Sequence, residues 1–362
     1  MAISTIDNNG ANLGQLGNRN MVTNGSMQVA QRSTSVAGIG ANGTAYHTLD
    51  RWQIETGGSN SGRFTMSQSS DAPSGFGSSL KLDCTTADTS IGTSEYLLLE
   101  YRIEGQDVQR IKKGTSDAEE ITISFYVKAN ASFNFVLEVL DATNNRACSK
   151  LFSTTTGWNR VEITYPADTT GEIVNSNAQG IRLFFWLHAG STFTSGTLNS
   201  SSFNTQTASK RASGISSFYS STNNEFYLTG VQMEVGDTAT PFEHRSFGDE
   251  LAKCKRYYNS SYNYGVVAGT ASNDTPINHM SRGGSYNIIG QMFHSTPMRA
   301  APTVVIYNPI NGTVNQLKGD GSSYANAAVL ADSFAGTTFY VNGTAISETV
   351  FLSVHATFDA EL

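Results

Sequence analysis

The sequence predicts an all-β protein of two or three domains. Charged residues make up only 15% of the 362 residues, whereas aromatic residues reach 10% and glycine numbers 34. Few charges together with many turn-forming and strand-forming residues are typical of all-β extracellular or virion proteins. The chain is too long for one ordinary domain. Strand-like segments recur along most of its length, so we expect a sizeable buried core rather than disorder.

Segments in which apolar and polar residues alternate mark the clearest strands of the first domain. Such period-two spacing gives a strand one buried face and one outward face. In residues 181–188, the outward face is also partly apolar, because Phe184 and Trp186 alternate with Arg182 and His188. This pattern predicts a central strand or one that lines a groove. The strands expected on these grounds cover residues 121–128, 133–139, 161–165, 181–188 and 228–235.

The strand at 228–235 is followed by an abrupt stop. Its apolar residues are Leu228, Val231, Met233 and Val235, whereas Gln232 and Glu234 point the other way. Gly236 and Asp237 break the strand, and Pro241 cannot donate to a sheet ladder. The chain therefore leaves the sheet here, and this strand closes a β domain.

The residues after this stop resemble a known family. They read Ala239-Thr240-Pro241-Phe242-Glu243-His244-Arg245. This sequence resembles the end of the carbohydrate-binding-module-like jelly roll of tailed-bacteriophage tail-fibre and virion surface proteins. The family's modules open with an Asn-Gly-x-Met strand, then Gln-Arg and Asp-Arg-Trp, and a Gly-x-Glu-Leu-x-x-Cys-x-Arg-Tyr-Tyr run follows them. The matching stretches here are Asn20 to Met27, Gln31-Arg32, Asp50-Arg51-Trp52 and Gly248 to Tyr258.

The resemblance implies a domain order. Residues 18–246 would form a galactose-binding-like jelly-roll β-sandwich. Residues 1–17 have no periodicity and form either an arm that docks on other virion proteins or a frayed terminus. A connector helix at 247–258 would pack on the jelly roll or lie at a three-fold axis, with Leu251, Cys254 and Tyr258 on one stripe. Residues 259–362 carry further strand-like runs and are expected to form a smaller C-terminal β-sandwich for trimerisation or receptor contact.

Sugar binding requires an aromatic ring to stack on a pyranose and polar side chains to bond its hydroxyls. Trp158 and Trp186 are the candidate platforms, and Tyr126, Arg182 and His188 are the candidate polar neighbours. The alternative for each is core or rim packing, and Trp52 is assigned to the core.

Two further roles follow from the resemblance. Related jelly rolls often hold a structural calcium ion near the first and last strands, and Asn24, Asp50 and Glu234 are the candidate oxygen ligands. The alternative is that these three side chains hydrogen-bond the backbone at strand ends. His244 in the closing motif is expected to lock the end of the domain by hydrogen bonds rather than to catalyse a reaction.

Several function classes are disfavoured. No nucleophile elbow, phosphate loop or zinc-protease motif occurs, and no carboxylate pair is clearly placed for glycoside hydrolysis, so we expect no enzyme, no catalytic residue and no cofactor. A net charge of −7 argues against a nucleic-acid partner. No apolar run approaches the ~18 residues that span a bilayer, and residues 1–20 lack the apolar core of a signal peptide. The three cysteines, Cys84, Cys148 and Cys254, are expected to be buried free thiols.

These observations favour a non-enzymatic phage fibre protein, such as a tail fibre, that attaches the virion to a bacterial surface glycan. It would be a homotrimer, because multivalency strengthens weak glycan contacts. It would be assembled in the host cytoplasm, where free thiols stay reduced. One alternative is an architectural virion protein, a head decoration or tail adaptor. Another is a spike that depolymerises a surface polysaccharide.

Overall fold

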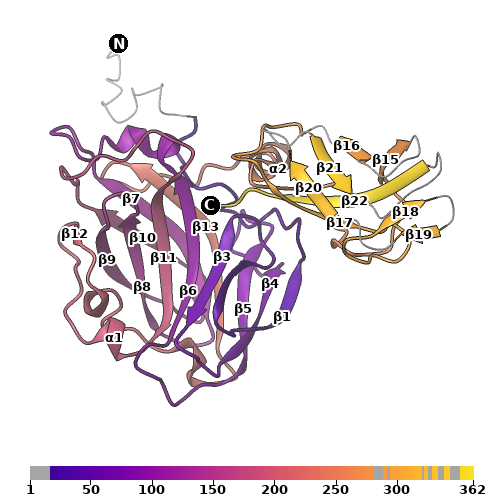
Figure 1. The fold of residues 1–362 in the computed structure, drawn as a ribbon. Helices are drawn as coiled ribbons and strands as arrows, with labels where there is room; N and C mark the ends of the chain where they lie inside the picture. Colours follow the sequence, from indigo (N-terminus) through magenta and orange to yellow (C-terminus); the bar gives the residue numbers. More distant parts are fainter. Residues whose placement is uncertain are drawn as a thin grey trace, which may run out of the picture.

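The computed structural model describes residues 17–280, 288–291, 294–319, 322–324, 328–332, 338–342 and 351–362. It shows a predominantly β protein in which strands of the first domain are followed by a helix and a second, smaller β domain (Figure 1). The expected N-terminal arm, residues 1–17, lies outside the described residues except for Gly17.

Two antiparallel sheets face each other in the first domain. The β13 sheet has the order β1-β4-β5-β13-β7-β10, and the β11 sheet has the order β12-β9-β8-β11-β6-β3-β2. Within them, β5-β13-β7-β10 faces β6-β11-β8-β9, which is the strand order of an eight-stranded jelly roll. The predicted jelly roll is therefore confirmed. The strands are β1 (Ser35–Ile39), β2 (Gly43–Tyr46), β3 (Trp52–Gly57), β4 (Arg63–Ser69), β5 (Ser79–Thr86), β6 (Tyr96–Glu104), β7 (Ile121–Ala129), β8 (Asn134–Asp141), β9 (Arg146–Ser153), β10 (Asn159–Tyr165), β11 (Gln179–Ala189), β12 (Asn204–Thr205) and β13 (Glu225–Val235).

One hydrophobic core fills the space between the two sheets. The ring of Phe125 in β7 meets the rings of Phe152 and Phe185 from the opposite sheet edge-on, at centroid distances of 5.1 and 5.3 Å. Trp52 is fully buried beside them and its indole N–H donates to the carbonyl oxygen of Asn24 over 3.2 Å. The assignment of Trp52 to the core is confirmed. Strand β11 pairs with β6 on one side and β8 on the other, so it is central, as its two apolar faces predicted.

A β-bulge in β13 explains how residues of opposite parity share one face. The register of β13 against β7 shifts between Thr229 and Gln232, and Gly230 has φ of 62°. A bulge adds one residue and restores the alternation beyond it. Leu228 and Val231 are therefore both buried in the core although they lie three positions apart.

The expected strand at Asn20 to Met27 is wrong, because this segment forms turns along β13. Its backbone bonds β13 at only two points, Met21 N–H to Met233 O at 2.9 Å and Val231 N–H to Gly25 O at 2.9 Å. Asn24 and Met27 both have φ of 57°, in the left-handed region, and this backbone cannot continue a strand.

The connector helix α2 (Phe247–Lys255) is shorter than predicted. The Ser246 hydroxyl caps it by accepting from Asp249 N–H over 3.2 Å. The N–H groups of Arg256 and Tyr257 bond back to Lys253 and Cys254, which closes the last turn. Tyr258 then pairs with the final strand instead of extending the helix.

The second domain is built around one long strand, β22. Strands β14 and β17 pair with its C-terminal half, and β15 and β18 pair with its N-terminal half. A three-stranded sheet, β16-β21-β20, contacts this larger sheet through β15 and β17. The strands are β14 (Tyr258–Ser260), β15 (Ile277–Met280), β16 (Ile288–Gln291), β17 (Thr303–Tyr307), β18 (Leu317–Gly319), β19 (Ser322–Tyr324), β20 (Ala328–Asp332), β21 (Thr338–Asn342) and β22 (Phe351–Asp359).

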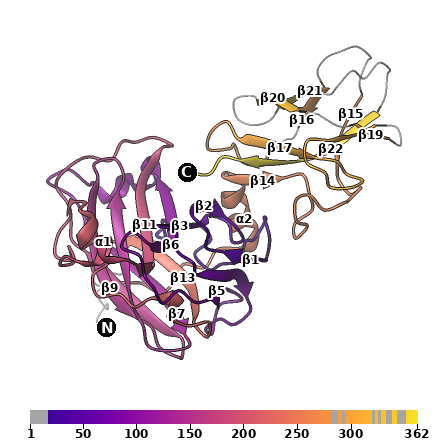
Figure 2. The ribbon, with the colours of Figure 1, turned by 60° about the horizontal axis from the view of Figure 1, so that its bottom comes forward.

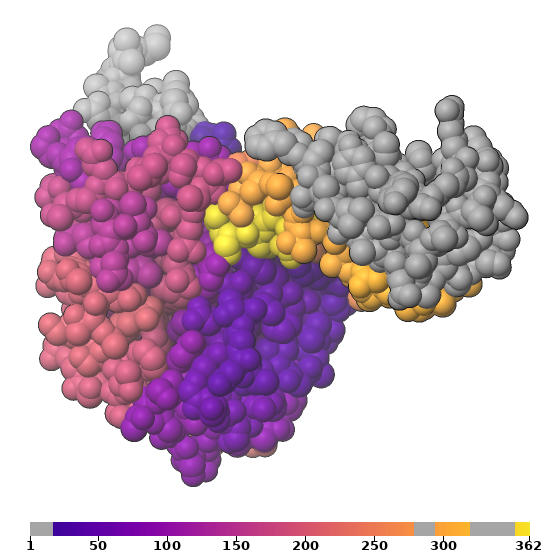
Figure 3. All heavy atoms as spheres, viewed as in Figure 1, coloured from indigo at the N-terminus to yellow at the C-terminus, as the bar shows by residue number. Residues whose placement is uncertain are grey.

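The C-terminal residues of the second domain, at and just after the end of β22, lie at the junction with the first domain (Figures 2 and 3). The carboxylate of Glu361 pairs with the buried guanidinium of Arg51, whose cationic carbon lies 3.4 Å from the ring centre of Tyr257. Arg32 pairs with Asp359 at 3.0 Å and with Glu361 at 3.4 Å. Arg32 and Arg51 belong to the two short motifs, Gln31-Arg32 and Asp50-Arg51-Trp52, so these motifs bind the C-terminal carboxylates of the second domain. We call Arg32 and Arg51 the arginine socket.

Candidate functional site

The five candidate glycan-binding residues do not form one site. Arg182 and Trp186 lie on the outer face of the β11 sheet, whereas a register shift between Trp186 and His188 pairs His188 with core-facing Leu97 and turns it toward the inner side. Tyr126 in β7 and Trp158, just before β10, lie on the opposite side of the sandwich, on the β13 sheet. Each face has to be judged on its own.

Trp186 is covered by a segment that folds over the β11 sheet. This segment, residues 190–217, contains α1 (Ser191–Thr194), η3 (Ala208–Lys210) and β12. The indole of Trp186 is 1% exposed and lies 5.1 Å from the ring of Phe193, with the Arg211 guanidinium 4.6 Å from its ring centre. Its N–H donates to Glu138 over 2.8 Å. Trp186 therefore has no free ring face for a sugar in this conformation.

His188 is fully buried at the inner side of the sheet, where its ring lies 5.1 Å from the ring of core Tyr219. Its Nδ1 lies 2.7 Å from the Ser217 hydroxyl, and its Nε2 lies 3.5 Å from Glu95. Burial lowers the pKa of the imidazole, against the opposing effect of Glu95. This enclosed ring is a packing residue of the core, and its contact with Ser217 anchors the end of the covering segment.

Arg182 belongs to a row of buried and partly buried charged side chains on the outer face of the β11 sheet. Its guanidinium pairs with Glu100 and lies 3.2 Å from Glu55. Arg102 holds the same Glu100 at 2.8 Å, and the Phe184 ring lies 4.4 Å from the Arg182 guanidinium. The donors of Arg182 are thus largely occupied within the protein.

Trp158 is the candidate platform that remains partly exposed. Its indole N–H donates to Asp71 Oδ1 over 3.0 Å, and the ammonium of Lys128 pairs with Asp71. The hydrogen bonds from Lys128 and Trp158 lower the pKa of the Asp71 carboxyl. These contacts fix the orientation of the ring without covering it.

Further aromatic and charged groups adjoin Trp158. The Tyr227 ring meets it edge-on at 6.1 Å, and the ammonium groups of Lys128 and Lys81 lie 4.4 and 5.5 Å from the Tyr227 ring centre. Lys81 also pairs with Glu225 at 2.6 Å. We call this group the Trp158 patch, made up of Asp71, Lys81, Lys128, Trp158, Glu225 and Tyr227. Sequence reasoning found only Trp158, although the outward alternation of Lys81 with core Leu80 and Leu82 was a signal for one neighbour.

Tyr126 lies in an aromatic cluster on the same sheet rather than in the patch. Its ring is 5.3 Å from Phe76, which in turn contacts Phe242 at 5.1 Å and His244 at 5.0 Å. His244 thus packs by its ring. The hydrogen bonds that lock the end of the domain are made by the residues on either side of it.

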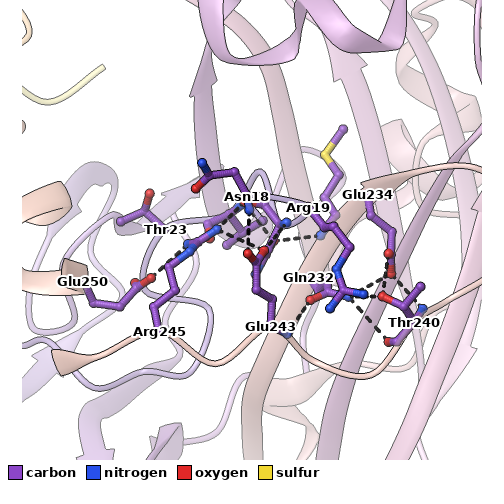
Figure 4. Close-up of polar contacts among 12 residues, drawn as sticks. Asn18, Arg19, Thr23, Gln232, Glu234, Thr240, Glu243, Arg245 and Glu250 are labelled. Atoms are coloured by element: carbon purple, nitrogen blue, oxygen red, sulfur yellow. Dashed lines mark hydrogen bonds and ion pairs between the residues drawn. The ribbon is translucent and has the colours of Figure 1, made fainter. Parts of the chain in front are cut away.

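Those neighbours, Glu243 and Arg245, tie the opening segment to the closing motif (Figure 4). Glu243 accepts hydrogen bonds from the backbone N–H groups of Asn18 and Asn20 over 2.6 and 2.7 Å. Arg245 donates to the Val22 carbonyl oxygen and pairs with Glu250 of α2 at 2.9 Å. The prediction of a hydrogen-bonded lock was right for the motif and wrong for His244.

The three candidate calcium ligands all make hydrogen bonds within the protein. Asn24 donates to the carbonyl oxygens of Val29 and Asp50, both over 2.9 Å. Asp50 accepts from Gln31 N–H over 2.9 Å, and Glu234 accepts from Thr240 N–H over 2.9 Å. Within the described ranges, no cluster of three or more His, Cys, Asp or Glu side chains is arranged to hold a metal ion. These contacts match the alternative role, in which the three side chains hold backbone groups.

Cys84, Cys148 and Cys254 are buried free thiols, as predicted. Among the described residues, no helix is long and apolar enough to cross a membrane.

No family model matches the chain, and no curated protein matches it. Several solved structures are similar to it in part. A CBM4 structure has 14% identity and a TM-score of 0.32, and the match covers 59% of this chain and 99% of that one. The CBM22-1 xylan-binding domain of Paenibacillus barcinonensis Xyn10C has 10% identity and a TM-score of 0.29, over 61% of this chain and 96% of that one.

The third similar structure is the enzymatically active domain of tailspike protein 4 of bacteriophage CBA120. It has 12% identity and a TM-score of 0.31, and the match covers 60% of this chain but only 21% of the tailspike chain. The jelly-roll assignment rests on the strand order of the two sheets.

Proposed function

We propose that this protein is a non-enzymatic fibre protein of a phage virion, such as a tail fibre, that attaches to a bacterial surface glycan through the Trp158 patch. The observation that carries the proposal is the partly exposed Trp158 ring, oriented by Asp71 and flanked by Tyr227 and Lys128. The ring offers an apolar surface to a pyranose, and the charged neighbours offer donors and acceptors to its hydroxyls.

A single patch of this size supports only weak binding, so attachment requires several copies. We propose a homotrimer carried in several copies on the virion, with residues 1–17 as the contact to other virion proteins. The β22 domain would then serve trimer or receptor contact. Assembly in the host cytoplasm agrees with the three buried free thiols.

The carboxylates on the β11 face support a non-enzymatic role. Both oxygens of Glu138 are occupied, by Arg211, Gln206 and the Trp186 indole, and the residue is fully buried. Glu100 is likewise buried and held by two arginines. Glycoside hydrolysis needs one carboxyl that donates a proton and a second that faces the sugar, and neither of these two groups is free to do so.

The test is binding of the full-length protein to purified surface polysaccharides and to a glycan array, with the Trp158→Ala variant beside the wild type. We expect the variant to lose at least about tenfold in apparent affinity, because a stacking platform is removed. Phe247→Ala is the matched control, since Phe247 is an exposed aromatic residue outside the patch.

Four outcomes would contradict parts of the proposal. Equal glycan binding by Trp158→Ala and wild type would remove the patch from the site. A blank glycan screen together with capture by purified virion proteins would favour the architectural role. Shortening of the polysaccharide during incubation would favour a depolymerase, and a monomeric mass in light scattering would refute the self-assembling homotrimer.

A further inference from the structure

A second candidate binding site lies where the jelly roll meets α2 and the second domain. It is a cavity of about 410 Å³, and its lining comes from the opening segment, from η2 (Gly105–Ile111) and from α2. The volume falls in the range of small-ligand sites and can hold one or two sugar rings. The lining residues that matter for the argument are Asn18, Thr23, Asp107, Arg110, Lys253 and Thr296.

Two cationic side chains that line this cavity form no ion pair within the described residues, although the carboxylates of Asp107 and Glu243 attract both from a greater distance. Lys253 makes no ion pair or hydrogen bond within the part of the chain that the structure describes, and burial lowers the pKa of its ammonium group. Arg110 donates to the Asn18 carbonyl oxygen, and its side chain is exposed to solvent. A third cation at the cavity, Arg256, is already held by Glu104 at 2.8 Å. A negatively charged ligand would pair with the partly buried ammonium of Lys253 and with the accessible guanidinium of Arg110.

The cavity also contains groups that a simple anion does not need. Asp107 lines it, and burial and the nearby Glu104 raise the pKa of its carboxyl. Asp107 is a hydrogen-bond acceptor, and the hydroxyls of Thr23 and Thr296 can both donate and accept. A carboxylate repels a bare anion but accepts hydrogen bonds from sugar hydroxyls, so the ligand should carry both a negative charge and hydroxyl groups.

We propose that this cavity binds an acidic sugar unit, of the uronic acid type, within a polysaccharide. Lys253 and Arg110 contact the sugar carboxylate, and Asp107 accepts from a ring hydroxyl. The site is separate from the Trp158 patch, because its lining comes from the domain junction and the patch lies on the outer face of the β13 sheet. Either site can therefore fail without the other.

The experiment is titration calorimetry of the full-length protein with galacturonic and glucuronic acid oligomers, with neutral galactose oligomers and inorganic phosphate as comparison ligands. We expect Lys253→Gln to weaken uronic acid binding at least about tenfold, or about 1.4 kcal/mol, with an unchanged melting temperature. Lys255→Gln is the matched control, because it removes the same charge from the same helix outside the cavity. Binding to Lys255→Gln and to Trp158→Ala should equal that of the wild type.

Asp107→Asn separates a sugar acid from a simple anion. It should weaken uronic acid binding and should leave phosphate binding unchanged or stronger. The proposal is refuted if the wild type binds no uronic acid oligomer at millimolar concentration, or if Lys253→Gln binds as tightly as Lys255→Gln. It is also refuted if phosphate and uronic acid bind with equal affinity and Asp107→Asn changes both affinities by the same factor. That result would describe a site for anions in general.

Discussion

Removing the carboxylate of Glu361 should destabilise the whole protein, because it leaves a buried cation without its partner. Arg51 is 1% exposed and Glu361 is 5% exposed, so neither side chain is substantially hydrated. Deleting one partner of a buried ion pair costs about 3–5 kcal/mol. At about 2–4 °C per kcal/mol for a chain of this class, Glu361→Gln should lower the melting temperature by about 6–20 °C.

Thermal unfolding followed by circular dichroism measures this effect, and Glu119→Gln is the control. Glu119 pairs with Lys112 at 2.7 Å, but both side chains are more than 40% exposed, so its loss should cost less than about 1 kcal/mol. Replacing both buried partners, as Arg51→Met with Glu361→Leu, should recover much of the stability, since an apolar pair leaves no charge unpaired.

The reasoning fails if Glu361→Gln melts within about 1 °C of the wild type. That result would mean that Arg51 remains satisfied by its other contacts, the Tyr257 ring and the Arg102 carbonyl oxygen.

Three further predictions concern stability. Burial raises the pKa of Asp50 from 3.8 to about 6, which means that the folded protein favours the protonated carboxyl. The free energy of unfolding that this group adds is therefore fully present below pH 3.8 and is lost as the pH rises through 6. Asp50→Asn should reduce the stability difference between pH 4 and pH 7 in urea unfolding by about 2 kcal/mol, and an unchanged difference would contradict this. If Asn24, Asp50 and Glu234 hold backbone groups rather than calcium, added chelator should leave the melting temperature within about 1 °C, whereas a fall of several degrees reversed by calcium would establish a metal site. Gly230→Ala should cost about 1–3 kcal/mol, since its new carbon would lie 2.8 Å from Phe76 at a φ of 62°; Gly75→Ala, at φ of 93° with open space, isolates the backbone strain.

Much of the first domain could be predicted because its strands obey a local rule. Alternation of period two reports burial on one face, and β7, β8, β10, β11 and β13 all contain such a run. The prediction of a strand at Asn20 to Met27 was wrong because Asn24 and Met27 adopt left-handed backbone angles, which a hydrophobic pattern does not reveal.

The candidate site was harder to predict because covering and pairing are not local properties. Trp186 lies between Phe185 and Leu187 and Trp158 lies between Gly157 and Asn159, and in the structure only Trp186 is enclosed. The segment that encloses it, residues 190–217, is rich in serine and threonine and shows no periodicity. Asp71, Lys128 and Tyr227 come from three separate stretches, and only the strand order brings them to Trp158.

Two of the motifs that carry the family resemblance bind the second domain, and this role could not be inferred from their sequences. Arg32 and Arg51 contact residues more than 300 positions away in the sequence. A motif that serves as a socket can be noticed in a sequence, but its partner becomes visible only in the folded chain.

The position of β22 also has a kinetic consequence. Every pairing of β14, β15, β17 and β18 with β22 must wait until β22 has been synthesised, because it follows them all along the chain. The jelly-roll strands, in contrast, are all available about 115 residues earlier. Since domains tend to fold in order during translation, a nascent jelly roll should carry its arginine socket open to water until β22 arrives, and closure of that socket should be a late event in folding.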